Sequence, residues 1–250
     1  MASDGVLAVM VVVIMLNLFT AAAGLALFAL AIWVVVDPYK LYPISAVSGK
    51  DDIFAAAWIA VFTGFAYFCT AIFGVYAAVK KRRSLMLVYL MLMFIIFIFE
   101  CASCITAVTN RDYLVGNSNL VKNQMLTYYG SNSNQGQQIT ATWNKVMQDA
   151  QCCGTDGPLD WVTFNSTFKQ TYGSFNWPLH CCKTQYSIDP ADQTGCMLGQ
   201  TSALYSSGCF NYIQSKLNIY TWSVSWYGFA VQILVFFLLL IAMFYFLLLD

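Results

Sequence analysis

Four long apolar stretches constrain the fold of this chain more than any other feature of its sequence. They run approximately from Val6 to Val36, from Ile53 to Val79, from Leu85 to Val108 and from Trp222 to Leu249. About 20 apolar residues suffice for a helix to cross the roughly 30 Å hydrocarbon layer of a bilayer, and only 10% of the chain is charged. We therefore expect an all-α membrane protein built as a four-transmembrane-helix bundle. The first stretch lacks the basic start of a signal peptide, so we expect it to be retained as a signal anchor.

Four consecutive basic residues predict the orientation of these spans. Lys80, Lys81, Arg82 and Arg83 lie between the second and third spans, with no acidic residue among them. Because cytoplasmic loops are enriched in Lys and Arg, we expect this loop and both termini to be cytoplasmic. The predicted division is the N-terminus with the first span (1–36), a small extracellular loop (37–52), the second span (53–79), a cytoplasmic loop (80–84), the third span (85–108), a large extracellular loop (109–221), and the fourth span with a short cytoplasmic end (222–250).

The large loop has the composition of a small domain outside the cytoplasm. It is rich in Asn, Gln, Ser, Thr, Gly and Tyr, and it holds six of the nine cysteines. Small domains of this kind use disulfides because their cores are small. Apolar residues at helical spacing predict helices over 135–150 and 209–219, whereas the prolines and glycines of 172–208 favour loops fixed by cysteines. We expect a mainly helical, disulfide-stapled domain.

The cysteine pattern favours disulfides over a metal site. Cys152-Cys153 and Cys181-Cys182 are adjacent pairs, and neighbouring cysteines rarely bond to each other because a disulfide needs Cα atoms about 5.5 Å apart with suitably directed side chains. Each is expected to bond elsewhere, but spacing alone leaves several pairings open. Zinc ligands usually occur at Cys-x2-4-Cys spacing in reducing compartments, so no metal is expected. The remaining cysteines lie inside spans, where they are expected to pack as small apolar side chains: Cys69, Cys101 and Cys104.

Three motifs of the large loop resemble the signature of the tetraspanin family. They are Cys152-Cys153-Gly154, Pro178-Leu179-His180-Cys181, and Gly208-Cys209 just before the last span. The combination with four spans is specific, and the resemblance covers the whole chain. It implies disulfides Cys152–Cys209 and Cys153–Cys181, which leaves Cys182–Cys196 as the third.

Shorter segments resemble the uroplakin branch of that family. They run from Ser48 to Asp52, from Phe99 to Thr106 and from Arg111 to Tyr113. This resemblance implies a scaffold that pairs with a single-span partner similar to uroplakin II and packs, through contacts with like and unlike neighbours, into hexagonal plaques on the apical urothelial surface. The plaques would form a permeability barrier. Aromatic residues of the large loop are candidates for the contact surface, although some of them must fill the core of the loop: Tyr128, Tyr129, Phe175, Trp177, Tyr186 and Tyr205.

Asn165 is the candidate glycosylation site. Asn165-Ser166-Thr167 is the only Asn-x-Ser/Thr sequence in the chain, and its middle residue is not proline. In a loop that faces the lumen during synthesis, we expect an N-linked glycan at this position. The uroplakin resemblance implies recognition of that glycan by mannose-binding bacterial fimbrial adhesins.

Three strongly polar residues lie within the spans, namely Asn17, Glu100 and Gln232. Polar groups there are costly unless they face protein or water. Counting about 1.5 Å per residue from the cytoplasmic ends places all three at depths of roughly 18–26 Å, so we expect them to share one layer inside the bundle. Hydrogen bonding between helices is the simpler role, and the tetraspanin resemblance also allows a bound sterol such as cholesterol, or another lipid, at this layer.

Small residues at four-residue spacing predict close contact between the first two spans. Ala56, Ala60 and Gly64 repeat on the second span, and Ala22 and Ala26 on the first. Such residues let helix backbones approach closely in lipid. We expect a contact within the chain, and recruitment of a partner's span by the same face is the less favoured alternative.

No group of residues indicates an enzyme. His180 is the only histidine and lacks Ser and Asp companions at a recognisable triad spacing. A transporter or channel is disfavoured because the spans contain a single Glu and no proline along a pathway. Zero net charge gives no basis for nucleic-acid binding. The remaining alternative is a tetraspanin that organises other membrane receptors or assists their trafficking.

Overall fold

The chain folds into two compact units, here called the bundle unit and the loop unit. The computed structural model describes residues 2–47, 52–109, 117–183 and 190–249. The bundle unit comprises Met1–Val36, Asp52–Thr109 and Tyr220–Asp250, and the loop unit comprises Asp37–Asp51 and Asn110–Ile219. The described residues are helical apart from turns, loops and one isolated antiparallel bridge between Cys182 and Leu204.

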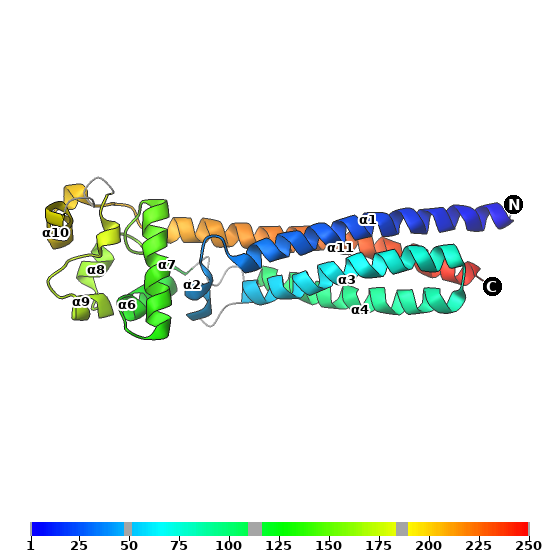
Figure 1. The fold of residues 1–250 in the computed structure, drawn as a ribbon, viewed down its shortest axis with the longest axis horizontal. Coiled ribbons are helices and arrows are strands. Elements are labelled where there is room, and N and C mark those ends of the chain that lie inside the picture. The colour runs from blue at the N-terminus through cyan, green and yellow to red at the C-terminus, as the bar shows by residue number, and fades with distance from the viewer. Residues whose placement is uncertain (1, 48–51, 110–116, 184–189, 250) are drawn as a thin grey trace. The chain divides into compact units, whose positions relative to one another are not determined.

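Four long helices form the bundle unit (Figure 1). They are α1 (Ala2–Val36), α3 (Asp52–Lys80), α4 (Arg83–Thr109) and the part of α11 (Phe210–Leu248) that begins at Tyr220. Each helix is long and apolar enough to cross a membrane. The predicted all-α class with four candidate spans is therefore confirmed.

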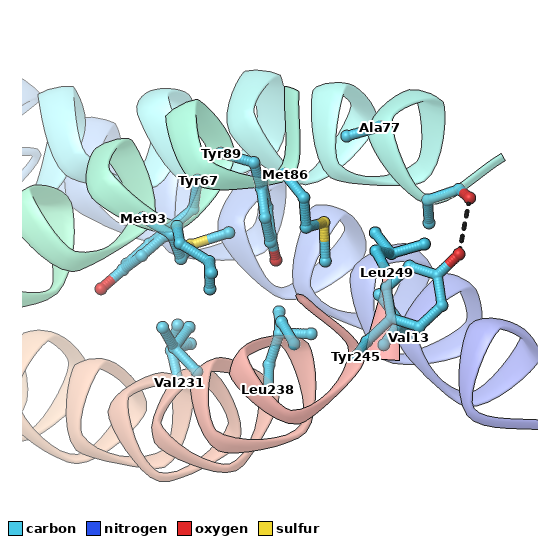
Figure 2. Packing of buried hydrophobic residues seen from close by; sticks show 14 residues of the cluster. Val13, Tyr67, Ala77, Met86, Tyr89, Met93, Val231, Leu238, Tyr245 and Leu249 are labelled. Atoms are coloured by element: carbon cyan, nitrogen blue, oxygen red, sulfur yellow. Dashed lines mark hydrogen bonds between the residues drawn. The ribbon is translucent and has the colours of Figure 1, made fainter. Parts of the chain in front are cut away.

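The interior of the bundle unit contains large side chains from all four helices. Figure 2 shows Tyr67, Tyr89 and Met93 of α3 and α4 on one side and Val231 and Leu238 of α11 on the other, and all five are at most 2% exposed. The dashed hydrogen bond in the same figure runs from the Tyr245 hydroxyl to the Ala78 carbonyl over 3.0 Å. Many other apolar side chains point outward, as expected for a surface that meets lipid, among them Phe62, Met91 and Leu240.

Short helices make up most of the loop unit. The longest that lies wholly within it is α7 (Asn134–Ala150), where Ser133 caps the start by accepting from the Gly136 amide at 3.0 Å. Its buried face holds Ile139, Trp143, Val146 and Met147, so the helix predicted over 135–150 is confirmed. The other elements are α2 (Tyr42–Val47), α6 (Ser118–Tyr128), α8 (Leu159–Thr163), α9 (Thr167–Thr171), η1 (Leu179–Cys181), α10 (Pro190–Leu198), η3 (Thr201–Ala203) and the first part of α11.

Helix α10 was not expected, because 172–208 was predicted as loops. The helix begins at Pro190 and is followed by Gly199, which has a φ of 147°. Proline suits the first turn of a helix and glycine suits the position after its end. The same two residues that favour a loop therefore mark the two ends of a helix. Cys196, within this helix, is buried.

Candidate functional site

Three disulfides cross-link the loop unit. They join Cys152 to Cys209, Cys153 to Cys181 and Cys182 to Cys196, with Cα–Cα distances of 5.1, 4.8 and 6.1 Å. The first two are the pairs that the family resemblance implies, and the third is the pair that they leave. The members of each adjacent pair bond to different partners. Cys152–Cys209 connects the segment after α7 to the start of α11, and Cys153–Cys181 connects the same segment to η1. Cys182–Cys196 connects the residue after η1 to α10.

Two glycines allow the backbone to approach itself around these bonds. Gly154 has a φ of 70°, and a Cβ added there would collide with the Gly157 carbonyl. A Cβ on Gly208 would collide with the Thr155 carbonyl. The amide of Cys209 donates to the Gly154 carbonyl at 2.9 Å. The glycines of both cysteine motifs are therefore required by close backbone contact.

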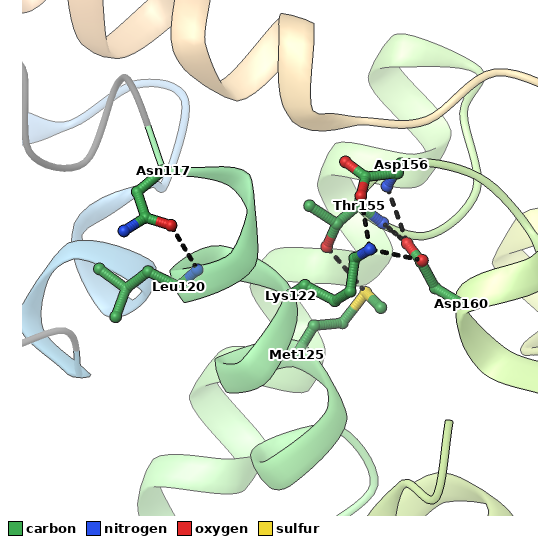
Figure 3. A network of polar contacts seen from close by, with 7 residues as sticks. All are labelled: Asn117, Leu120, Lys122, Met125, Thr155, Asp156 and Asp160. Carbon is green, nitrogen blue, oxygen red and sulfur yellow. Dashed lines mark hydrogen bonds and ion pairs between the residues drawn. The ribbon is translucent and has the colours of Figure 1, made fainter. Parts of the chain in front are cut away.

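Lys122 of α6 contacts two carboxylates, as Figure 3 shows. Its Nζ lies 2.5 Å from Asp156 Oδ2 and 3.2 Å from Asp160 Oδ1. Asp160 is buried, and its Oδ2 also accepts from the backbone amides of Thr155 and Asp156 at 2.9 and 2.8 Å. The hydrogen bond with Asp156 raises the pKa of Lys122, which keeps it cationic. This cluster joins α6, the segment after Gly154, and α8.

An aromatic cluster packs α8 and α9 against the end of α6. The rings of Trp161 and Phe168 lie 4.8 and 5.8 Å from that of Tyr129. Tyr129 is buried, and so is Trp177, whose Nε1 donates to the Cys196 carbonyl at 2.6 Å. Tyr129 and Trp177 are therefore among the candidates that fill the core of the loop unit, and they do not belong to its contact surface.

Other large apolar side chains of the loop unit are exposed. Leu159 is 72% exposed and Phe164 is 44% exposed, and Val162 lies between them on α8. Tyr172 and Leu198 are exposed elsewhere. The three remaining aromatic candidates in the described part of the chain are partly buried: Tyr128, Phe175 and Tyr205. Tyr186 lies outside the described residues.

Asn165 lies at the surface, in the link between α8 and α9. Its Oδ1 accepts from Gln170 Nε2 at 3.3 Å. Ser166 is buried, and its Oγ accepts from the Lys169 amide at 3.1 Å at the start of α9. Thr167 Oγ1 donates to the backbone carbonyl of Thr127 in α6 at 2.6 Å. The amide that would carry a glycan is accessible, while its two neighbours have structural contacts.

Glu100 is buried among polar groups of the bundle unit. Thr63 Oγ1 donates to Glu100 Oε2, and Cys104 Sγ lies 3.8 Å from Oε1. A Cβ on Gly228 of α11 would lie 2.8 Å from the same oxygen. One helical turn further, Gln232 Nε2 donates to a backbone carbonyl of α4 at 3.0 Å, and its Oε1 has no hydrogen-bond partner in the described part of the chain. Glu100 and Gln232 therefore occupy one region of the interior.

Asn17 lies outside that region. Its Oδ1 accepts from the Tyr89 hydroxyl at 2.9 Å. Tyr89 and Glu100 both belong to α4, where their positions differ by roughly 16 Å at 1.5 Å per residue. The expected common layer of Asn17, Glu100 and Gln232 is therefore wrong for Asn17. The depth count assumed that all apolar stretches begin at one plane, whereas α1 extends beyond the adjoining ends of α3 and α4 (Figure 1).

A cavity of about 470 Å³ lies between α4 and α11, beside Gln232. Its lining is apolar apart from the Gln232 side chain and two thiols. Cys104 is buried and Cys101 is half-buried, and neither forms a disulfide. The volume suits an apolar chain or ring system. The lining residues are Phe97, Cys101, Cys104, Ile105, Phe229, Gln232, Ile233, Phe236 and Phe237.

Helices α1 and α3 approach each other through glycines. A Cβ on Gly24 would lie 2.9 Å from the Gly64 carbonyl oxygen. Ala56 and Ala60 of α3 are buried, whereas Ala22 of α1 is exposed and Ala26 is only half-buried. The expected close contact between the two helices is therefore present, but the expectation for Ala22 is wrong. Helix α1 is apolar on every side, so no period in its sequence marks the face that packs.

The basic residues 80–83 form the turn between α3 and α4. Lys80 ends α3, Lys81 adopts a left-handed backbone with a φ of 51°, and Arg83 begins α4. All four side chains are exposed. Lys80 Nζ lies 5.7 Å from the centre of the Tyr76 ring, and the Arg83 guanidinium lies 4.9 Å from that of Phe246.

The described residues contain no group of three or more His, Cys, Asp or Glu side chains that could hold a metal ion. His180 lies beside Cys181 in η1 and is half-buried, and burial lowers its pKa. Two uroplakin-like segments, at 48–52 and 111–113, lie wholly or mostly outside the described residues, whereas the segment from Phe99 to Thr106 belongs to α4.

Comparison with known proteins places the chain in a family. The model of the tetraspanin family matches residues 9–248. Uroplakin-1a of Bos taurus is 48% identical over 93% of this chain and 91% of its own length. Uroplakin-1a of Homo sapiens is 48% identical over 92% of this chain and 90% of its own length. Uroplakin-1b of Bos taurus is 38% identical over 92% of this chain and 91% of its own length. The uroplakin-like segments favour uroplakin Ia with uroplakin Ib second, and the identities follow the same order. The chain is therefore a multi-pass membrane protein with the features of a uroplakin-like scaffold, and it belongs to the tetraspanin family.

Proposed function

We propose that this chain is a non-enzymatic scaffold that pairs with a single-span uroplakin partner and packs, as heterodimers, into hexagonal plaques of the apical plasma membrane. The similarity to uroplakin-1a over 93% of the chain is the observation that carries the proposal. The cross-linked loop unit supports it, because a rigid surface loses little conformational entropy on binding. Such plaques would act as a permeability barrier of the urothelium.

The proposed orientation has the turn at Lys80–Arg83 and both chain ends in the cytoplasm, with the loop unit outside. The basic turn supports it through the general bias of cytoplasmic loops. The three disulfides support it too, because such bonds persist in oxidising compartments. An epitope on the N-terminus should bind antibody only after cells are permeabilised. Staining of intact cells would reverse the assignment.

We place the partner contact on Leu159 and Phe164. Leu159 is 72% exposed and begins the short helix α8, and Phe164 is 44% exposed and directly follows that helix. Exposed apolar side chains that cluster on a soluble surface commonly mark interaction sites, and the centres of interfaces are enriched in aromatic residues.

Affinity capture of the tagged full chain from urothelial membranes tests this function. A single-span membrane protein should co-purify with the wild type and be lost from a Leu159→Glu/Phe164→Glu variant. Leu198→Glu is the matched control, because Leu198 is 51% exposed at the end of α10. Capture of no single-span protein would contradict the pairing itself. Equal capture by the wild type and the double variant would contradict only the contact surface.

We further propose an N-linked glycan on Asn165 that serves bacterial fimbrial adhesins as a receptor. The exposed position of Asn165 supports the modification. Mannose-binding adhesin should bind the wild-type chain and lose it after glycosidase treatment. Binding that survives complete deglycosylation would end this part of the proposal.

The region around Glu100 and Gln232 is proposed to hold the helices together and to receive a sterol or another lipid. The adjoining cavity, lined by Gln232 among mostly apolar side chains, supports a lipid occupant. For Asn17, the bond with Tyr89 supports a packing role instead. A photoreactive sterol should crosslink less to a Glu100→Leu variant than to the wild type. Equal crosslinking would leave only the packing role.

A further inference from the structure

The turn between α3 and α4 gathers four positive charges into the shortest connection of the bundle unit. Helix α3 ends at Lys80 and α4 begins at Arg83, so two residues separate the helices. The Lys81 amide donates to the Ala78 carbonyl at 3.3 Å, and the Met86 amide donates to the Arg82 carbonyl at 3.2 Å. The backbone of the turn is thereby tied to both helices. The four charges cannot separate as they would on a long loop.

The four side chains are not equivalent. Lys80 lies over the ring of Tyr76, and Arg83 lies over the ring of Phe246. These cation–π contacts hold the two outer cations against the helices. Lys81 and Arg82, between them, are exposed and have no ion-pair partner in the described part of the chain. The inner pair therefore carries the charge that is available to a ligand.

The surroundings of Lys81 and Arg82 favour an anionic ligand at the surface of the bilayer. Tyr76 is 51% exposed one turn before Lys80, and tyrosine side chains are enriched where the headgroups of a bilayer begin. Clusters of four or more Lys and Arg next to a transmembrane helix attract anionic lipids. A headgroup phosphate offers several strong acceptors, which a guanidinium binds in bidentate fashion and an ammonium binds as a point charge.

We propose that Lys81 and Arg82 form a binding site for the headgroup of an anionic phospholipid in the adjacent leaflet. Lys80 and Arg83 raise the local positive potential and position the turn. In the orientation proposed above this leaflet is the cytoplasmic one, which is rich in anionic lipids. The site itself does not depend on that orientation, so it can be tested apart from it.

Titration of the purified full chain in neutral detergent micelles tests the site. The probes are dioctanoyl phosphatidylinositol 4,5-bisphosphate, dioctanoyl phosphatidylserine and dioctanoyl phosphatidylcholine, with binding followed by microscale thermophoresis. We expect affinity to rise with the negative charge of the headgroup and to fall as salt is added, because exposed charges are screened over about 10 Å at 0.1 M salt. Equal affinity for phosphatidylcholine and the anionic lipids would overturn the proposal.

Two variants locate the site. Lys81→Gln/Arg82→Gln should weaken binding of the bisphosphate lipid about 25-fold, since each cation contributes about fivefold at a membrane surface. Lys81→Arg/Arg82→Lys keeps both charges and should retain affinity within about twofold. The matched control is Lys169→Gln/Lys183→Gln, which removes two charges from the loop unit and should leave affinity unchanged. Wild-type affinity in the first variant would contradict the assignment.

A further titration distinguishes binding of a lipid from binding of a soluble anion. Inositol 1,4,5-trisphosphate carries the phosphates without the acyl chains. It should bind more weakly than the dioctanoyl lipid, because the chains add contacts with the apolar flanks of α3 and α4. Equal affinity for the two probes would overturn the lipid assignment in favour of a soluble polyanion.

Discussion

At the scale of single residues, Asp160 connects three parts of the loop unit. Its carboxylate accepts from the amides of Thr155 and Asp156 and pairs with Lys122. A buried carboxylate is tolerated only when its hydrogen-bonding capacity is satisfied. The cluster was not predicted, because no local pattern links Lys122 to carboxylates more than 30 residues away in the chain.

Removing the Asp160 carboxylate should destabilise the loop unit by about 2–4 kcal/mol, since the amides of Thr155 and Asp156 would lose their acceptor and Lys122 would keep only Asp156. The change Asp160→Ala can be measured by native-state hydrogen exchange of the full chain in detergent. Asp149→Ala is the control, because Asp149 is exposed on α7 and should change the opening free energy by less than about 0.5 kcal/mol. A similar small change for Asp160→Ala would show that the cluster is dispensable.

Thr167 has a contact that makes two ways of removing the glycosylation sequence unequal. Asn165→Gln and Thr167→Ala should both abolish the glycosidase-sensitive gel shift. Only Thr167→Ala removes the hydrogen bond to the Thr127 carbonyl, so it should unfold more easily than Asn165→Gln by about 1 kcal/mol. Thr167→Ser should keep both the gel shift and the bond. Identical unfolding of the two unglycosylated variants would mean that this hydrogen bond contributes nothing.

At the scale of helices, the long elements were predictable and their packed faces were not. Length and hydropathy identify α1, α3, α4 and α11, because lipid demands long apolar helices. The face of α1 was assigned to Ala22 and Ala26, whereas Gly24 makes the close contact. In lipid, the outward side of a helix is as apolar as the inward side, so the periodic signal that marks a soluble helix is lost.

The short helices are hard to predict from the sequence for a different reason. The sequence of α10 favours a loop, although Pro190 and Gly199 suit the two ends of the helix. The bond between Cys182 and Cys196 fixes that helix to the segment after η1. Such long-range constraints stabilise helices too short to form alone. In the bundle, the bonds from Tyr89 to Asn17 and from Thr63 to Glu100 were missed because they depend on relative heights of helices.

The contact of α1 with α3 should be sensitive to a single methyl group. A Cβ on Gly64 would lie 2.7 Å from the Phe28 backbone nitrogen, so Gly64→Ala should cost about 1–3 kcal/mol through overpacking. Gly5→Ala is the matched control, because a Cβ there meets nothing within 4 Å. We expect a lower melting temperature in detergent for the first variant and no decrease for the second. Equal melting temperatures for the two variants would show that α1 and α3 can move apart enough to accept the methyl group without loss of stability.

At the scale of the whole molecule, the two units are stabilised by different means. The bundle unit relies on helix packing, and its Cys69, Cys101 and Cys104 are free. The loop unit has short helices, a small core and three disulfides with sequence separations of 57, 28 and 14 residues. Bonds that close loops of such lengths contribute about 3–4 kcal/mol each, mainly by restricting the unfolded chain. The loop unit should therefore depend on oxidation, whereas the bundle unit should not.

Reduction should separate these two stabilities in one molecule. With a phosphine reductant followed by alkylation, we expect amides of the loop unit to exchange hydrogen at least about 100-fold faster, since the loss of even one bond exceeds the 2.7 kcal/mol of that factor. Amides of α1, α3 and α4 should keep their protection, because no disulfide restrains those helices. Hydrogen exchange with mass spectrometry of the full chain in detergent resolves both regions. Loss of protection in both regions at once would show that the bundle needs the folded loop unit, and unchanged protection in both would show that packing alone holds the loop unit together.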